Sequence, residues 1–97
     1  MFIVSEKSGP NGILAVVTDE NILGKKFVEG KLQLDLTQEF YKGERKNEEE
    51  VKEIFQKSQH LHLTGEKAVA LGVELKVISQ ERILWVSGVP HAEAVME

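Results

Sequence analysis

The stretch Phe2–Val17, FIVSEKSGPNGILAVV, decides the fold that we predict for this chain. It holds two apolar, largely β-branched runs, Phe2–Val4 and Ile13–Val17, which Ser8-Gly9-Pro10-Asn11-Gly12 separates. Because an Asn-Gly pair supplies the positive φ angles of tight hairpin turns, we expect a strand, a turn and a second strand. The second run is apolar on both faces, so it predicts a central, buried strand.

Two further strands are predicted later in the chain. Leu32, Leu34 and Leu36 alternate with polar residues, which is the period of a half-buried strand. Ile83–Val86 predicts another short strand with Trp85 as an anchor in the core. Asp19–Phe27 predicts a short helical turn that Asp19 caps.

Two helices are expected in the second half of the chain. Asn47 and Glu50 have the spacing of a capping box, and Val51, Ile54 and Phe55 form an apolar stripe at helical spacing. A second helix should begin after Thr64 and is apolar nearly all round, so it should be buried. We therefore predict one α+β domain over residues 1–97, with a mostly antiparallel sheet of about four strands and two main helices on one face.

Composition and charge exclude several classes of protein. The 97 residues include no cysteine, which excludes disulfides, thiolate zinc sites and a cysteine nucleophile. Residues 47–97 hold five Lys/Arg and nine Asp/Glu, which accounts for the whole net charge of −4. With neither a signal-peptide pattern nor an apolar run that could span a bilayer, we expect a cytoplasmic protein that does not act at a membrane.

The carboxyl-terminal stretch SGVPHAEAVME carries the first candidate site residue, His91. Pro90 fixes its own φ and restricts Val89, so the backbone at His91 is held. A held imidazole suits proton transfer or metal binding, and packing with backbone hydrogen bonds is the alternative. We expect residues 89–95 to be ordered against the domain, with His91 at least half buried.

His60 and His62 form the second candidate, because alternate residues of an extended segment share one face. Both rings could meet one metal ion if His91 or a carboxylate supplied a third ligand. The competing interpretation has Leu61 and Leu63 pointing inward and the histidines facing water. Since no thiolate or third histidine lies nearby in the sequence, we expect no stoichiometric zinc and no cofactor.

Basic and aromatic residues form the third candidate, a modest RNA-binding surface. Tyr41 could stack on a base, and phosphate contacts could come from nearby cations. A solvated turn is the alternative, and the net acidic charge weakens the RNA interpretation. The complete set of candidate binding residues is Lys25, Lys26, Tyr41, Lys42, Arg45, Lys46 and His91.

Four segments resemble an archaeal family of small conserved proteins, domain-of-unknown-function family 424. They are Ala15–Phe27, Phe40–Gly43, Thr64–Val69 and Gly88–Ala92, in this order within a resemblance that runs from about Phe2 to Val95. The family pattern tends to have a glycine near Lys76, after the second helix, and Val at the position of Thr64. The resemblance implies an archaeal, cytosolic α+β protein and implies no activity.

The leading functional prediction is a non-enzymatic binding module for RNA or a translation-linked protein partner. The chain has no nucleophile-elbow pattern, no nucleotide-binding loop and no DNA-binding motif. The alternative is a small enzyme or metal-binding protein that uses His91 with His60 or His62. The sequence leaves the oligomeric state open.

Overall fold

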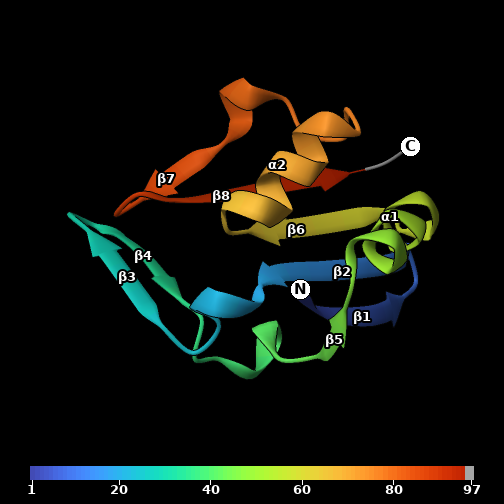
Figure 1. Ribbon diagram of the computed structural model, residues 1–97, viewed down its shortest axis with the longest axis horizontal. Coiled ribbons are helices and arrows are strands. Elements are labelled where there is room, and N and C mark those ends of the chain that lie inside the picture. Colours follow the sequence, from blue (N-terminus) through green and yellow to red (C-terminus); the bar gives the residue numbers. More distant parts are fainter. Residues whose placement is uncertain (96–97) are drawn as a thin grey trace.

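A six-stranded sheet forms the centre of the computed structural model, which describes residues 1–95. Two helices cover one face of this sheet, and a two-stranded hairpin, β3–β4, projects beside one edge (Figure 1). The strands are β1 (Phe2–Gly9), β2 (Gly12–Asp19), β3 (Lys26–Glu29), β4 (Leu32–Asp35), β5 (Glu44–Lys46), β6 (His60–Thr64), β7 (Leu84–Val86) and β8 (Val89–Val95). The helices are α1 (Glu48–Lys57) and α2 (Glu66–Glu74), with short 3₁₀ turns η1 (Glu20–Ile22), η2 (Glu39–Tyr41) and η3 (Gln80–Arg82).

The strand order is β5-β1-β2-β6-β8-β7, and every neighbouring pair is antiparallel except β2 and β6. The α+β class and the mostly antiparallel sheet with two helices on one face are thus confirmed. The expected number of about four strands is wrong. Strand β5 is too short and polar to give a pattern, and the residues of β8 predict an ordered tail without indicating that it is a strand.

The predicted hairpin is present, but its turn residues are Pro10 and Asn11, and of the Asn11-Gly12 pair only Gly12 has a positive φ, 106°. β1 and β2 pair from Phe2 opposite Asp19 to Gly9 opposite Gly12. The apolar strand β2 lies inside the sheet, between β1 and β6, as predicted. Leu32 and Leu34 also form a strand, but it pairs with β3 in the separate hairpin.

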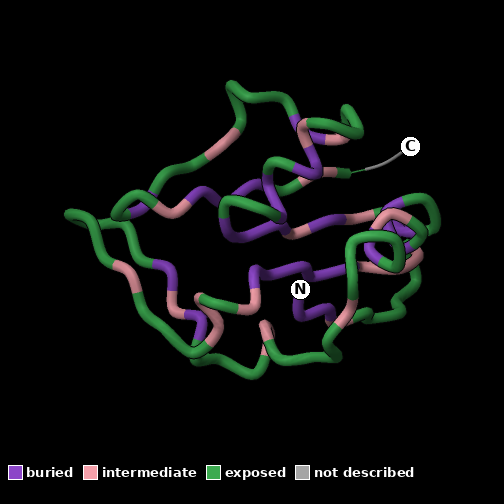
Figure 2. The backbone as a smooth tube through the Cα atoms, viewed as in Figure 1, coloured by how far each residue is buried: buried purple, intermediate pink, exposed green. Residues whose placement is uncertain are grey.

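The main core lies between the helices and the sheet. Because side chains alternate along a strand, β1, β2, β6 and β8 each direct one set of residues toward the helices. Figure 2 shows that burial is concentrated in these central strands. The cluster consists of Phe2, Val4, Ala15, Val17, Val51, Ile54, Phe55, Leu61, Leu63, Ala68, Val69, Leu71, Ile78 and Ala92.

The second face of the sheet carries the other set of side chains, which includes Val16, Thr18, His62, Thr64 and His91. The segment from β4 to η2 lies over part of this face, since η2 contacts β1 and β2. Leu34 and Leu36 are buried outside the main core. The face is therefore partly covered and more polar than the helix side.

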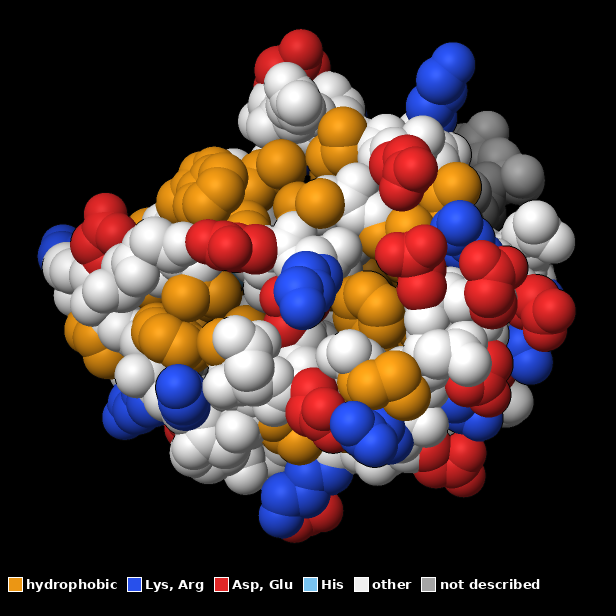
Figure 3. All heavy atoms as spheres, viewed as in Figure 1, with side chains coloured by type: hydrophobic (Ala, Val, Ile, Leu, Met, Phe, Trp, Pro, Cys, Tyr) orange, Lys and Arg blue, Asp and Glu red, His pale blue; other side chains and the backbone are white. Residues whose placement is uncertain are grey.

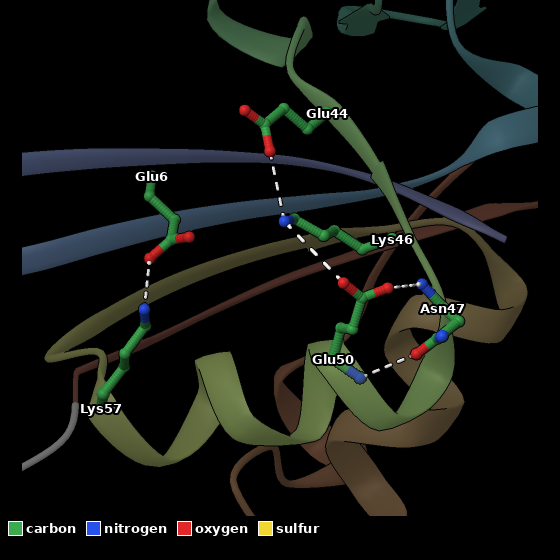
Figure 4. Close-up of polar contacts among 6 residues, drawn as sticks. All are labelled: Glu6, Glu44, Lys46, Asn47, Glu50 and Lys57. Carbon is green, nitrogen blue, oxygen red and sulfur yellow. Dashed lines mark hydrogen bonds and ion pairs between the residues drawn. The ribbon is translucent and has the colours of Figure 1, made fainter.

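Helix α1 begins as the sequence predicts. The Asn47 side chain accepts a hydrogen bond from the Glu50 backbone N–H at 2.9 Å, and the Glu50 carboxylate accepts one from the Asn47 N–H at 3.0 Å (Figure 4). These reciprocal bonds satisfy two amide groups that the first helical turn leaves free.

Asp19 caps α2 and not the 3₁₀ turn that follows it, so the predicted cap on Asp19–Phe27 is wrong. Its carboxylate accepts hydrogen bonds from the backbone N–H groups of Lys67 at 2.9 Å and Ala68 at 2.8 Å. Since β2 and β6 are parallel, both end at the same sheet edge, which brings Asp19 to the start of α2. Gly65, with φ 109°, is required there because a Cβ atom would meet the Asp19 side chain at 2.4 Å.

Helix α2 ends in a Schellman motif. The Lys76 N–H donates to the Val73 carbonyl at 3.0 Å, and the Val77 N–H donates to the Gly72 carbonyl at 2.9 Å. Lys76 adopts φ 61°, a left-handed conformation that glycine takes at much lower cost. Position 76 is therefore one with a specific backbone requirement.

The carboxyl-terminal stretch is an internal strand. β8 pairs with β6 on one side and with β7 on the other, and His91 is only 9% exposed. These observations confirm the expected order of residues 89–95 and the burial of His91. Trp85, by contrast, is 53% exposed, so its predicted role as a core anchor is wrong.

Replacing Asp19 with alanine should lower the free energy of unfolding by about 1–2 kcal/mol, because two amide N–H groups of α2 lose their acceptor. Urea denaturation measures the change. Asn21→Ala, at an exposed neighbouring position, should stay within about 0.5 kcal/mol of the wild type. Equal stability of the Asp19→Ala variant and wild type would refute the cap.

Replacing Lys76 with glycine should raise the free energy of unfolding by about 0.5–1 kcal/mol, since glycine adopts the left-handed conformation without strain. Ala70→Gly, within α2 and exposed, should lower it by about 1 kcal/mol. Both values come from denaturation curves. A Lys76→Gly variant as destabilised as Ala70→Gly would contradict the Schellman assignment.

Truncation after Gly88 should abolish cooperative unfolding, because it removes the strand that joins β6 to β7. The loss of β8 exceeds the few kcal/mol of a single core substitution and is comparable with the whole stability of a small domain. Circular dichroism during heating measures the effect. Val95→Gln, at a position that is 70% exposed, should melt like the wild type, and a truncated chain with the same melting curve would show that β8 is dispensable.

Candidate functional site

Three potential metal ligands meet on the second face of the sheet. His62 and Glu93 are register partners on the adjacent strands β6 and β8. His91 lies two residues before Glu93 on β8, so both point to the same face. One ligand atom from each of these three residues lies within 4.8 Å of the other two.

A hydrogen bond with a neighbouring strand holds the imidazole ring of His91 in place. Thr64, its register partner on β6, places Oγ1 2.8 Å from His91 Nδ1. This contact fixes the ring so that the other nitrogen, Nε2, points toward Glu93. Burial lowers the pKa of the His91 imidazole below its usual value, against an opposite effect of the Glu93 carboxylate. The imidazole is therefore neutral at neutral pH.

Glu93 lies between the two imidazoles and is the most exposed member of the cluster. One carboxylate oxygen lies 3.2 Å from His62 Nε2, and the other lies 3.6 Å from His91 Nε2. The Glu93 side chain is 61% exposed, whereas those of His62 and His91 are 26% and 11% exposed. The site thus has a buried imidazole side and a carboxylate side that faces solvent.

Aromatic side chains line the site on the side of η2. The Phe40 ring packs edge-on against His62 at a centroid distance of 5.3 Å and against Tyr41 at 5.1 Å. Burial raises the pKa of the Tyr41 hydroxyl, and the carboxylates of Glu93 and Asp35 add to this effect. The Thr18 hydroxyl, next to Thr64 in the sheet register, is buried and has no partner among residues 1–95.

The structure separates the two histidines of the H-x-H pair by position relative to the cluster. Both lie on the face opposite Leu61 and Leu63, as the sequence indicates, but the cluster of ligand atoms includes His62 and not His60. The carboxylate of the cluster is that of Glu93. The sequence could not identify it, because a residue in an apparent tail gives no sign of pairing with His62.

Most candidate RNA-binding cations lie beside carboxylates. Lys42 Nζ is 2.8 Å from Glu39, and Arg45 Nε is 2.7 Å from Glu20. Lys46 Nζ lies 3.2 Å from Glu44 and 3.9 Å from Glu50 (Figure 4). The hydrogen bond that the Lys46 ammonium donates to the Glu44 carboxylate is the main cause that raises the pKa of Lys46.

The other members of the candidate RNA surface differ in exposure. Lys25 and Lys26 are exposed and have no ion-pair partner among the described residues. Tyr41 is half-buried, and His91 is buried on the second face of the sheet, where it contacts Thr64 and Glu93.

Trp85 lies in a surface groove on the helix side of the sheet. It is the register partner of Pro90 at the edge strand β7. Because α2 packs mainly on β2, β6 and β8, the ring at the edge stays half uncovered. Figure 3 shows hydrophobic side chains gathered where β7 lies beside α2. The groove measures about 300 Å³, and its lining residues are Glu66, Val69, Ala70, Val73, Gln80, Ile83, Trp85 and Pro90.

Comparisons with known proteins give a family and a fold. Residues 6–96 match a family described as "Protein of unknown function (DUF424)". An uncharacterized conserved protein from Methanopyrus kandleri has a similar crystal structure, with a TM-score of 0.77 and 18% sequence identity over 99% of this chain and 93% of that chain. No curated protein matches the sequence. Among the described residues, neither helix has the length and apolar character needed to cross a membrane.

Proposed function

This chain belongs to the DUF424 family of proteins of unknown function, and we propose that it is a non-enzymatic binding module whose ligand is another protein. The observation that carries this proposal is the exposure of Trp85 in an apolar groove. Tryptophan is enriched among the residues that dominate the binding energy of protein interfaces.

The groove combines the features of a small protein-binding surface. Val69, Val73 and Pro90 provide an apolar floor, and the Trp85 ring stands at one side with 53% of its surface exposed. Exposed apolar surface with a polar rim is typical of interaction sites. Glu66 and Gln80 contribute the polar rim here.

Charge indicates the chemistry of the partner. Residues 47–97, which include the whole groove, carry the entire net charge of −4, and Glu66 lies at the groove itself. An apolar side chain flanked by Lys or Arg fits this surface best, because opposite potentials favour encounter and correct orientation. The proposed ligand is therefore a basic protein segment with an apolar anchor.

A protein ligand is favoured over RNA because most of the candidate RNA-binding cations already lie beside carboxylates. Lys42, Arg45 and Lys46 already have carboxylates within 4 Å, so a phosphate would have to compete with these groups. Aromatic stacking from the half-buried Tyr41 is also restricted. A protein partner needs none of these contacts, since the Trp85 groove lies on the helix side of the sheet.

Photo-cross-linking tests the proposal. A photoreactive residue at position 70, in the groove, should capture one defined protein from an extract of the source organism. The same probe at position 28, exposed on β3 and outside the groove, should not capture that protein. Trp85→Ala should reduce the yield at position 70 roughly tenfold or more, the effect of removing an interface hot spot. Leu84→Ala, a neighbouring exposed residue, should leave the yield unchanged.

Three outcomes would contradict the proposal. Capture of RNA at position 70, lost in the Lys25→Glu, Lys42→Glu double variant, would move the function to the basic residues. Capture of a second copy of this chain would show self-association in place of a separate partner. Equal yields with Trp85→Ala and wild type would show that the groove does not bind.

A further inference from the structure

A second site, unrelated to the Trp85 groove, lies on the opposite face of the sheet. We propose that His62, His91 and Glu93 bind one divalent transition-metal ion of the zinc type, with a fourth position open to solvent. The expectation of no metal rested on the lack of a third ligand near the H-x-H pair. Glu93 supplies that ligand across the β6–β8 pairing.

The first argument is the spacing of the ligand atoms. Ligands that bind zinc tetrahedrally at about 2.0–2.1 Å lie about 3.3 Å from one another. Glu93 Oε1 lies 3.2 Å from His62 Nε2, and the other carboxylate oxygen, Oε2, lies 3.6 Å from His91 Nε2. All three ligand atoms are within 4.8 Å, so small side-chain rotations close the site around an ion without any movement of the sheet.

The second argument is the orientation of His91. A metal-binding histidine usually donates its other ring N–H to a nearby acceptor, which fixes the tautomer and the ring plane. Thr64 Oγ1, 2.8 Å from His91 Nδ1, can act as this acceptor when the ring carries its hydrogen on Nδ1. In that tautomer Nε2 is a bare lone pair directed at a carboxylate 3.6 Å away. Two electron-rich atoms at this distance, too long for a hydrogen bond, are stabilised by a cation between them.

The third argument is the rigidity and access of the site. His62, His91 and Glu93 all lie on internal strands of the sheet, not on loops. Phe40 packs against the ring of His62 and shields one side, while the exposed Glu93 leaves the other side open. Three protein ligands with an open fourth position are the arrangement found in zinc sites that hold a water molecule.

The ligand set selects the class of metal. Imidazole nitrogens suit zinc, cobalt, nickel and copper, whereas magnesium and calcium require oxygen ligands almost exclusively. Two imidazoles and one carboxylate therefore favour zinc over magnesium. The choice follows from the residue types at the site.

Cobalt and zinc titrations of the full chain, free of a histidine tag and treated with chelator, test the proposal. We expect one Co²⁺ per chain with the strong visible absorption of tetrahedral coordination, displaced by Zn²⁺ and not by Mg²⁺. His62→Gln and Glu93→Gln should each weaken Zn²⁺ binding by roughly 100-fold or more, and Thr64→Val by about 10–100-fold through loss of the orienting hydrogen bond.

His60→Gln is the matched control, because His60 lies on the same strand and the same face but outside the cluster. It should bind Zn²⁺ as the wild type does, and circular dichroism should show that all four variants remain folded. The absence of 1:1 binding at micromolar metal would overturn the proposal. An equal loss in His60→Gln and His62→Gln, or displacement of Co²⁺ by Mg²⁺, would overturn it too.

Discussion

The parallel pairing of β2 with β6 is the contact on which the rest of the structure depends. It is the one strand pair that joins the β5-β1-β2 half of the sheet to the β6-β8-β7 half. The register sets Leu14 beside His60 and Thr18 beside Thr64, so that both strands end at the same edge. Each half alone would leave the strongly apolar β2 or β6 at an exposed edge.

The positions of the important polar groups follow from this register and from that of β6 with β8. Asp19, one residue after Thr18, reaches the start of α2, which begins two residues after Thr64. A second register, that of β6 with β8, places Thr64 opposite His91 and His62 opposite Glu93. The helix cap therefore depends on the β2–β6 register and the histidine cluster on the β6–β8 register, and Thr64 takes part in both pairings.

The sequence could predict the features that depend on neighbours along the chain. The β1–β2 hairpin follows from turn-forming residues between apolar runs, although the turn residues are Pro10 and Asn11 and not the predicted Asn-Gly pair. The start of α1 follows from Asn47 and Glu50. The features it could not predict depend on distant residues. Asp19 directly precedes a short helical turn that it could cap. It instead accepts a hydrogen bond from Lys67 of α2, 48 positions further along the chain. Trp85 is apolar enough for the core, but it lies on an edge strand that α2 does not cover.

The candidate sites also combine features that the local sequence indicates with features that depend on distant residues. Alternation along β6 placed His60 and His62 on one face, and the stiff Val89-Pro90 pair indicated that His91 is held. Neither pattern shows that His62 and Glu93 are partners, because 31 residues separate them and the β6–β8 register is set by tertiary pairing. The basic residues lie near one another in the sequence, and no local signal shows that Glu20 lies beside Arg45.

The internal position of β8 also has a consequence for synthesis on the ribosome. A nascent chain is made from its amino terminus, and its hairpin β1–β2 can close as soon as it emerges. The strand between β6 and β7 comes last among the eight, so the sheet stays open at that place until residues 89–95 have been made. During that interval β6 presents an unpaired edge, which is the kind of surface that chaperones bind and that unwanted strand pairing uses.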